Sequence, residues 1–408
     1  MARQGRLRLG LILLFVVSYP CFSSFSAGKT IPLPAGLKSA LEGADPRPQV
    51  DVAADEVAKF ISGLPCDDPN LKALQETEEW KSFAEELEKS WAEMQAARLD
   101  PMKTWACSEL REATAATETL FYPFCGPDFL TAFVLFPEPE TYVLLGLEFV
   151  GQLPVFDRAS PDVLAHVKGY LADLNLALSD FFKKSYFITR NMEHALVGHE
   201  VEGVLPLLCF FLKRTDHVIS SMKRCEFDGR GGLMEFDFSV KRKITRRPYG
   251  VKIEFFEKRE NHLRTLYYFS ADLEDVVFLK DGSFYRYLNG LTFQSTFIKS
   301  ASYLMHYRTF SNIKNLILTK SLYVVEDDTG IPYRDFSPKD WDVVLYGEYI
   351  KPVSDFKGVD QPDLEKAYAE SPDVRKLPFH LGYHWGTNKD SILYFQRKSG
   401  PEFVRTVP

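Results

Sequence analysis

Carboxylates offer the best candidates for chemistry in this sequence. Asp327 and Asp328 stand side by side at the expected end of a strand, and Asp128 stands just before another expected strand. Two carboxylates brought together in a cleft can act as general acid and base on a glycosidic bond, or can hold a divalent cation. Asp-Asp-Thr-Gly is also an ordinary turn, because aspartate accepts hydrogen bonds from its own backbone and glycine tolerates positive φ. Both interpretations stay open at this level.

Five further side chains are candidates for binding a ligand: Tyr122, Cys125, Tyr333, Arg334 and His384. Tyr333 and Arg334 follow the Asp-Asp turn and would suit an anionic ligand. Cys125 lies in a Gly-Pro bend among aromatic residues, although free cysteines are usually buried and inert.

No strong catalytic or cofactor motif occurs in the sequence. The chain lacks HExxH, GxSxG, a Walker A loop and a CxxC pair. His194 and His199 are five residues apart, whereas two zinc ligands on one helix face are four apart. We therefore expect no metal site and no cofactor.

The charge of the chain argues against nucleic acid as a partner. The formal net charge is −7, and the mature chain is more acidic still if the arginine-bearing start is removed. Non-specific binding to nucleic acid needs a basic surface. A basic run lies within residues 241–264, and it is interpreted either as a solvated sheet face or as a site for an anionic glycan or phosphate. The aromatic fraction of 14% fits both aromatic sheet cores and a ligand groove.

The first residues predict a secretory signal peptide. Three arginines precede a short apolar run from Leu9 to Val17, and mostly small residues follow. The run is too short to span a bilayer, which takes about 20 residues. Cleavage is expected near Ser26 or Ala27, which places the protein in the periplasm or outside the cell. Cys21 as a lipid anchor is disfavoured, because Tyr19 and Pro20 do not fit a lipobox. No later apolar run reaches spanning length.

Five cysteines remain after cleavage, and an exported chain meets conditions that permit disulfides. Their pairing is left open, although Cys66 with Cys107 would be the first choice because the two flank a helical stretch. The five residues are Cys66, Cys107, Cys125, Cys209 and Cys225.

Periodicity divides the chain into a signal peptide (1–26), a tether (27–50), a helical region (51–119) and an α+β domain (120–408). Apolar residues recur every three or four positions in 71–99, which predicts a long helix ending at Asp100-Pro101. Segments 233–243, 250–258 and 263–269 alternate like strands and predict an antiparallel meander packed with helices. Segment 130–136 is also expected to be a strand. Helices and strands come in runs, which favours α+β over a doubly wound sheet.

Three segments of the chain carry a resemblance. They are Tyr-Pro-Phe-Cys-Gly-Pro-Asp-Phe-Leu at 122–130, Ser-Ala-Ser-Tyr-Leu-Met at 300–305 with Phe-Ser-Asn-Ile at 310–313, and Asp-Asp-Thr-Gly-Ile-Pro-Tyr at 327–333. Together they resemble a family of exported bacterial proteins of unassigned function, over most of residues 110–390. The resemblance implies export and one extended domain. In that family serine is the commoner residue where Cys125 stands, which argues against a thiol nucleophile.

These observations favour an exported protein that binds a small molecule, a glycan or an envelope protein through an aromatic cleft. One alternative is a carboxylate-dependent hydrolase of glycan or cell-wall material that uses Asp128, Asp327 and Asp328. Another is an envelope scaffold that docks through the 71–99 helix. The sequence leaves open whether the chain is an enzyme.

Overall fold

The computed structural model describes residues 48–187, 200–240, 247–280, 282–387 and 389–398. The predicted signal peptide, its cleavage site, Cys21, almost all of the tether and the part of the basic run at 241–246 lie outside these residues. Among the described residues, no helix has both the length and the apolar character needed to cross a membrane.

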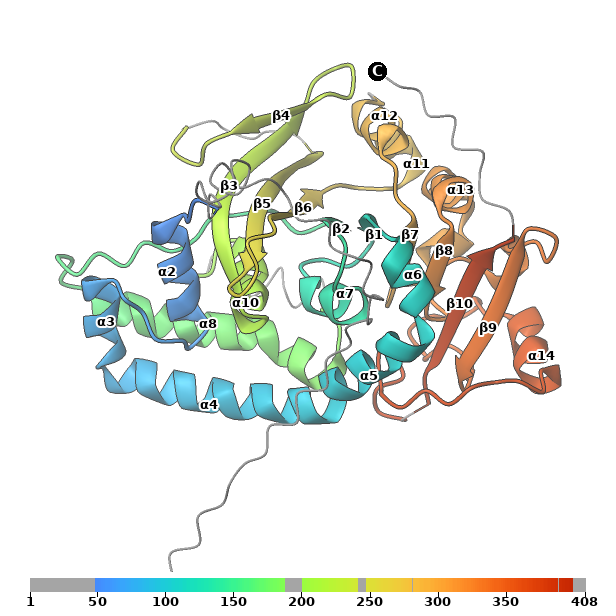
Figure 1. The fold of residues 1–408 in the computed structure, drawn as a ribbon, viewed down its shortest axis with the longest axis horizontal. Helices are drawn as coiled ribbons and strands as arrows, with labels where there is room; N and C mark the ends of the chain where they lie inside the picture. The colour runs from blue at the N-terminus through green and yellow to red at the C-terminus, as the bar shows by residue number, and fades with distance from the viewer. Residues whose placement is uncertain (1–47, 188–199, 241–246, 281, 388, 399–408) are drawn as a thin grey trace, which may run out of the picture. The chain divides into compact units, whose positions relative to one another are not determined.

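Helices occupy most of the first third of the described chain and recur between the later strands (Figure 1). The α-helices are α2 (Val52–Ile61), α3 (Pro69–Gln75), α4 (Glu78–Met94), α5 (Asp100–Glu109), α6 (Arg111–Ala116), α7 (Phe129–Leu135), α8 (Val163–Lys184), α10 (Leu205–Arg214), α11 (Asp275–Phe278), α12 (Ser283–Gly290), α13 (Ser311–Lys320) and α14 (Pro362–Glu370). The shorter helical turns are η1 (Gln95–Leu99), η2 (Leu304–His306), η3 (Arg308–Phe310) and η4 (Tyr333–Asp335).

The strands form one mixed sheet in the order β4-β3-β5-β6-β2-β1-β7-β8-β10-β9. They are β1 (Thr119–Tyr122), β2 (Thr141–Gly146), β3 (His217–Phe227), β4 (Leu233–Phe236), β5 (Tyr249–Glu257), β6 (Arg264–Ser270), β7 (Ser295–Ile298), β8 (Tyr323–Glu326), β9 (Trp341–Gly347) and β10 (Ser391–Arg397).

The five central strands of the sheet are parallel. β1 pairs with β2 on one side and with β7 on the other, β6 follows β2, and β8 follows β7. The chain therefore proceeds outward from β1 in both directions, which makes a topological switch point between β1 and β7. In such sheets the loops at the carboxyl ends of the strands diverge at the switch point and leave a crevice. The outer pairs β3–β4, β3–β5, β5–β6, β8–β10 and β9–β10 are antiparallel.

The expected class, α+β, is confirmed, but the expected antiparallel meander is wrong. β3 was not expected to be a strand, yet it lies between β4 and β5, and the centre of the sheet is parallel. Segment 130–136 is also not a strand but helix α7. Segment 130–136 is a short buried apolar run, which fits a strand or a helix equally well. β3 has a different reason, because it carries Ser, Lys, Arg and Glu among its apolar residues and shows no regular alternation.

Helices cover both faces of the sheet, divided by their position in the chain. Leu120 and Tyr122 of β1 face a core that includes helices α2 to α10. Phe121, between them, faces a second core with α11 to α14. The same alternation of Tyr142 and Val143 in β2 shows that central strands are covered on both sides. Because helices pack on both faces of the central strands, a ligand site is expected at the ends of these strands.

The helix expected over 71–99 is three elements. Thr77 ends the first segment and caps α4, accepting a hydrogen bond from the Trp80 amide. After α4 the chain continues through a π-helical turn into α5, whose second residue, Pro101, was expected to end the helix. Leu87 and Trp91 are buried, and α4 lies against α8 (Figure 1). The apolar stripe on which a scaffold role would depend is therefore packed inside the protein.

Candidate functional site

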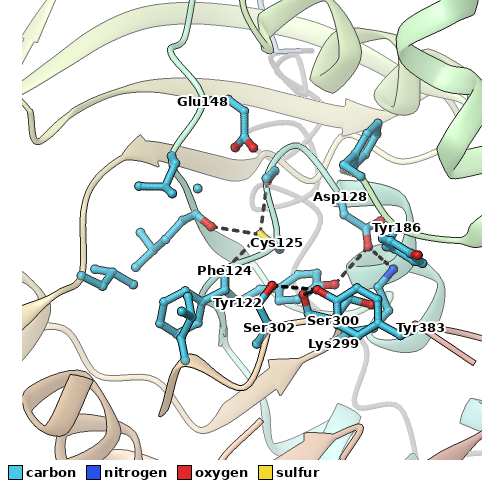
Figure 2. A pocket seen from close by; sticks show the side chains of 18 of the residues that line it. Tyr122, Phe124, Cys125, Asp128, Glu148, Tyr186, Lys299, Ser300, Ser302 and Tyr383 are labelled. Carbon is cyan, nitrogen blue, oxygen red and sulfur yellow. Dashed lines mark hydrogen bonds and ion pairs between the residues drawn. The ribbon is translucent and has the colours of Figure 1, made fainter. Parts of the chain in front are cut away.

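A cavity of about 540 Å³ lies at the carboxyl ends of the parallel strands. Its wall includes residues that follow β1, β2, β6 and β7, the strands on both sides of the switch point. Segments far apart in the sequence, such as Phe124 and Tyr383, meet there (Figure 2). The volume is within the range of about 300–1,000 Å³ typical of small-molecule sites.

The loop after β1 forms one wall of the cavity. Phe124 and Gly126 both adopt left-handed backbone conformations, with φ of 60° and 57°. Between them, the Cys125 thiol lies near three backbone carbonyls, those of Tyr122, Gly126 and Leu145. Burial raises the pKa of Cys125 well above its usual value, so the thiol stays protonated. Cys125, predicted as a ligand-binding residue, lines the cavity and holds the loop.

Asp128 lines the same wall, but its carboxylate is fully engaged. It caps α7 by accepting from the Thr131 amide at 3.0 Å, and it also accepts from the Tyr122 hydroxyl at 3.0 Å. Its third partner is the Lys299 ammonium at 2.6 Å, and both members of this ion pair are only 2% exposed. Burial and Asp128 together raise the pKa of Tyr122. Asp128 and Tyr122 therefore tie β1 to β7 through a buried pair.

The loop after β7 forms the opposite wall and is strained. Ser300, Ser302 and Tyr303 all have positive φ, between 53° and 55°, which non-glycine residues seldom adopt. Tyr383 contacts this loop through its hydroxyl, which donates to the Ser300 carbonyl at 2.8 Å and shares a 2.8 Å hydrogen bond with the Ser302 hydroxyl. Such strain persists only where the surroundings enforce it, and it concentrates at functional sites.

Asp327 and Asp328, which follow β8, accept hydrogen bonds from this strained loop. Asp327 accepts from the Ser300 amide at 2.8 Å and from the Thr329 amide at 3.0 Å. Asp328 accepts from the Tyr303 hydroxyl at 2.5 Å. Burial, followed by the charge of Asp327, raises the pKa of Asp328 to about 8, and burial also raises the pKa of Asp327. Neither residue lines the cavity. The structure thus links all three predicted aspartates to residues 299–303, as supports for the loop.

The remaining predicted residues lie elsewhere. Tyr333 and Arg334 are in η4, and 63% of the Arg334 side chain is exposed. His384 is buried, burial lowers its pKa, and neither of its ring nitrogens has a partner among the described residues. None of the three lines the cavity.

Glu148 is one of the cavity residues that the sequence analysis did not identify. It follows β2, it is only 7% exposed, and its carboxylate points into the cavity (Figure 2). Its one partner among the described residues is Tyr268, whose hydroxyl donates to the Glu148 carbonyl at 2.8 Å and to Oε2 at 3.3 Å. Burial raises the pKa of Tyr268, so the hydroxyl remains a donor. Oε1 has no hydrogen-bond partner within the described part of the chain.

Two glycines make room for this carboxylate. A Cβ on Gly146 would lie 2.7 Å from Glu148 Oε2 and 2.9 Å from the Cα of Gly126. A Cβ on Gly126 would lie 3.4 Å from the same oxygen. In dinucleotide-binding sheets an acidic residue about 20 positions after the glycine-rich turn that follows the first strand contacts the ribose. Glu148 has a comparable position after Gly126, although this loop has a single glycine and lacks that glycine-rich motif. The spacing brings Gly126 and Glu148 together because β1 and β2 pair in parallel, so that both strands end at the same edge of the sheet.

Aromatic rings line the side of the cavity next to Tyr383. The Tyr383 ring is 4.8 Å from Tyr186 and 4.8 Å from Phe356, measured between ring centroids. Phe124 and Phe310, with centroids 6.0 Å apart, add a second aromatic pair. These faces offer stacking surfaces for a flat or cationic group.

The cavity wall is acidic. Its carboxylates are Asp128, Glu148, Asp272 and Asp355, and its one basic side chain among the described residues is Lys299. Because Lys299 is paired with Asp128, no cation of the described wall is available to a ligand. The described residues contain no cluster of three or more histidine, cysteine or acidic side chains arranged to hold a metal ion. They also contain no disulfide, so Cys66 and Cys107 are not joined to each other.

Comparison of the chain with protein-family models, with curated proteins and with solved structures finds no match. The cavity and its wall are therefore the features of this chain that bear on its function.

Proposed function

We propose that the chain is an exported protein that binds a small organic molecule in the cavity at the carboxyl ends of its parallel strands. The observation that carries the proposal is the position of the cavity at the switch point between β1 and β7. In open parallel sheets, ligands bind in the crevice outside the carboxyl ends of the strands at such a point.

The character of the wall supports the same function. Apolar and aromatic faces surround a few convergent polar groups, which is the usual composition of a ligand site. The backbone is strained on both walls, at Phe124 and at Ser300, and buried bonds hold the strain in place. A hydrolase that uses Asp128 with Asp327 or Asp328 gains no such support, because each of these carboxylates already accepts two or more hydrogen bonds or ion pairs or lies outside the wall.

A blocking variant tests the proposal. Leu147 lines the cavity and is 43% exposed, so tryptophan in its place can be accommodated at the surface while it narrows the entrance. We expect Leu147→Trp to abolish the thermal stabilisation that the wild-type chain shows with members of a metabolite panel. Leu164→Trp is the control, because Leu164 is 51% exposed on α8 and does not line the cavity. Equal stabilisation of wild type and Leu147→Trp by every active compound would contradict the proposal.

Export has a separate test. The signal-like start of the chain supports it, and the mature amino terminus measured by mass spectrometry of protein from the native cell is expected to lie near Ser26 or Ala27. An intact Met1 on cytosolic protein would remove the export half of the proposal and leave the ligand site unaffected.

A further inference from the structure

We infer that the cavity binds a nucleoside without phosphates, whose other half carries a positive charge, with Glu148 accepting hydrogen bonds from the ribose hydroxyls. The inference deepens the proposed function and rests on it. A sulfonium nucleoside, S-adenosylmethionine, is the probe that combines these properties.

The ribose position follows from Glu148. In dinucleotide-binding parallel sheets, an acidic residue about 20 positions after the turn that follows the first strand binds the ribose hydroxyl. Here Glu148 follows β2, and Gly126 follows β1. Glu148 is only 7% exposed and Oε1 has no partner among the described residues, so the protein leaves this acceptor for a ligand. An ionised carboxylate accepts hydrogen bonds through both oxygens, and two vicinal hydroxyls can each donate one.

The direction of the base follows from the order of the strands. β6 lies beside β2 on the side away from β1, and Asp272 follows β6 on the cavity wall. A base that extends from a ribose at Glu148 toward β6 would place an exocyclic amino group near this second acceptor. The other half of the ligand then extends over β1 and β7, toward Tyr383 and Phe356.

The exclusion of phosphate follows from charge. A phosphate needs arginine, lysine or an open helix N-terminus. Lys299, the basic side chain of the described wall, is already paired with Asp128 at 2.6 Å, and Asp128 also occupies the N-cap of the short helix α7. Glu148, Asp272 and Asp355 would repel a polyphosphate and attract a cation. The aromatic faces of Tyr186, Phe356 and Tyr383 add cation–π attraction for a sulfonium or ammonium group.

Calorimetric titration of the full chain with five probes tests the inference. We expect adenosine to bind, S-adenosylmethionine to bind more tightly than the uncharged S-adenosylhomocysteine, 2′-deoxyadenosine to bind at least tenfold more weakly than adenosine, and ATP not to bind. These comparisons use the wild-type protein, so they do not depend on the folding of any variant. ATP binding as tight as adenosine, or no loss with 2′-deoxyadenosine, would overturn the nucleoside assignment. Tighter binding of S-adenosylhomocysteine would overturn the charge assignment.

Glu148→Gln supplies the residue-level test. We expect it to weaken adenosine binding tenfold or more while leaving the affinity for 2′-deoxyadenosine almost unchanged. Glu86→Gln, an exposed position on α4, is the control and should bind like wild type. The inference is contradicted if Glu148→Gln still prefers adenosine to 2′-deoxyadenosine as strongly as wild type does. If N-acetylglucosamine or another metabolite binds and no nucleoside does, and Leu147→Trp blocks that binding, the nucleoside inference fails while the proposed function stands.

Discussion

The carboxylates at the ends of β8 and β2 are buried to the same degree but have different surroundings. Asp327 is 5% exposed and Glu148 is 7% exposed. Asp327 accepts hydrogen bonds from two backbone amides and a hydroxyl, all of them in the loops that it holds. Glu148 lines the cavity, and among the described residues its carboxylate has one partner, Tyr268, on Oε2.

This difference distinguishes a carboxylate that stabilises the fold from a carboxylate that can bind a ligand. A buried carboxylate with every acceptor position used stabilises the fold, because its removal leaves donors unsatisfied. A buried carboxylate with an unused acceptor costs free energy in the absence of a ligand, and that cost is recovered when a donor binds. Burial alone does not distinguish Asp327 from Glu148. Their hydrogen-bond partners do.

The buried ion pair gives the largest expected effect on stability. Lys299→Met leaves Asp128 buried without its cation, which should lower the free energy of unfolding by about 3–5 kcal/mol. Lys314→Met is the matched control, since Lys314 also forms a 2.6 Å pair, with Asp335, but at 19% and 25% exposure. We expect that variant to lose about 1 kcal/mol or less in urea unfolding. Equal losses would show that Asp128 is not a supporting group.

The pH dependence of stability tests the β8 carboxylates. Asp328 has a pKa of about 8 in the folded protein, raised by burial and by Asp327, whereas an unfolded aspartate has a pKa of about 4. The folded state therefore binds more protons between these values, and stability is highest below about pH 4 for this group and falls as the pH rises toward 8.

Asp328→Asn cannot ionise, so its free energy of unfolding should fall much less between pH 5 and pH 8 than that of wild type. Asp373→Asn, at an exposed position, keeps the wild-type slope as the control. Urea titrations at several pH values give both slopes. An unchanged slope in Asp328→Asn would mean that this carboxyl is not held protonated by its surroundings.

The tyrosine that braces the strained loop should have a smaller effect. Tyr383→Phe removes the hydroxyl that bonds the Ser300 carbonyl and the Ser302 hydroxyl, which should cost about 1 kcal/mol. The aromatic contacts of the ring remain in the variant, so the loss reports the hydroxyl alone. Tyr307→Phe, at a tyrosine that is 52% exposed, is the control and should change stability little. If Tyr383→Phe lowers the free energy of unfolding more than Lys299→Met does, the hydroxyl stabilises the protein more than the buried ion pair, contrary to this prediction.

The smallest effect on stability is expected at Glu148. Glu148→Gln removes a buried charge that has no cation partner among the described residues, and its amide oxygen can still accept from Tyr268. We expect the free energy of unfolding to change by no more than about 0.5 kcal/mol, or to rise. Thermal and urea unfolding without ligand measure this. A loss comparable to that of Lys299→Met would place Glu148 among the supporting groups and weaken its assignment to a ligand.

Local patterns predicted elements well where one face meets water. The helical character of 51–119 could be predicted because apolar and charged residues alternate with helical spacing, as in α4. The α+β class followed from the runs of helix and strand. The strand expected over 263–269 is β6, whereas segment 130–136, expected to be a strand, is helix α7, because a short apolar run fits either state. The parallel pairing of the central strands could not be predicted, since it joins segments that are distant in the chain.

The candidate site divides in the same way. Asp128, Asp327 and Asp328 could be selected for their residue type and turn context, and Cys125 and Tyr122 for their neighbours. Their roles could not, because each depends on partners 25 or more residues away in the chain or on a loop conformation. The pairing of Asp128 with Lys299 and of Asp328 with Tyr303 exists only once β7 and β8 lie beside β1.

The amino-acid sequence by itself determined the signal-like start, the acidic charge, the α+β class and the aromatic content, since each is a property of composition or of neighbouring residues. The tertiary structure decided the parallel order of β6-β2-β1-β7-β8 and with it the cavity, because strand pairing joins segments that are distant in the chain. It also decided which carboxylates line the cavity. Local sequence sets the chemical type of a side chain, whereas long-range packing sets which of its acceptor atoms remain unused.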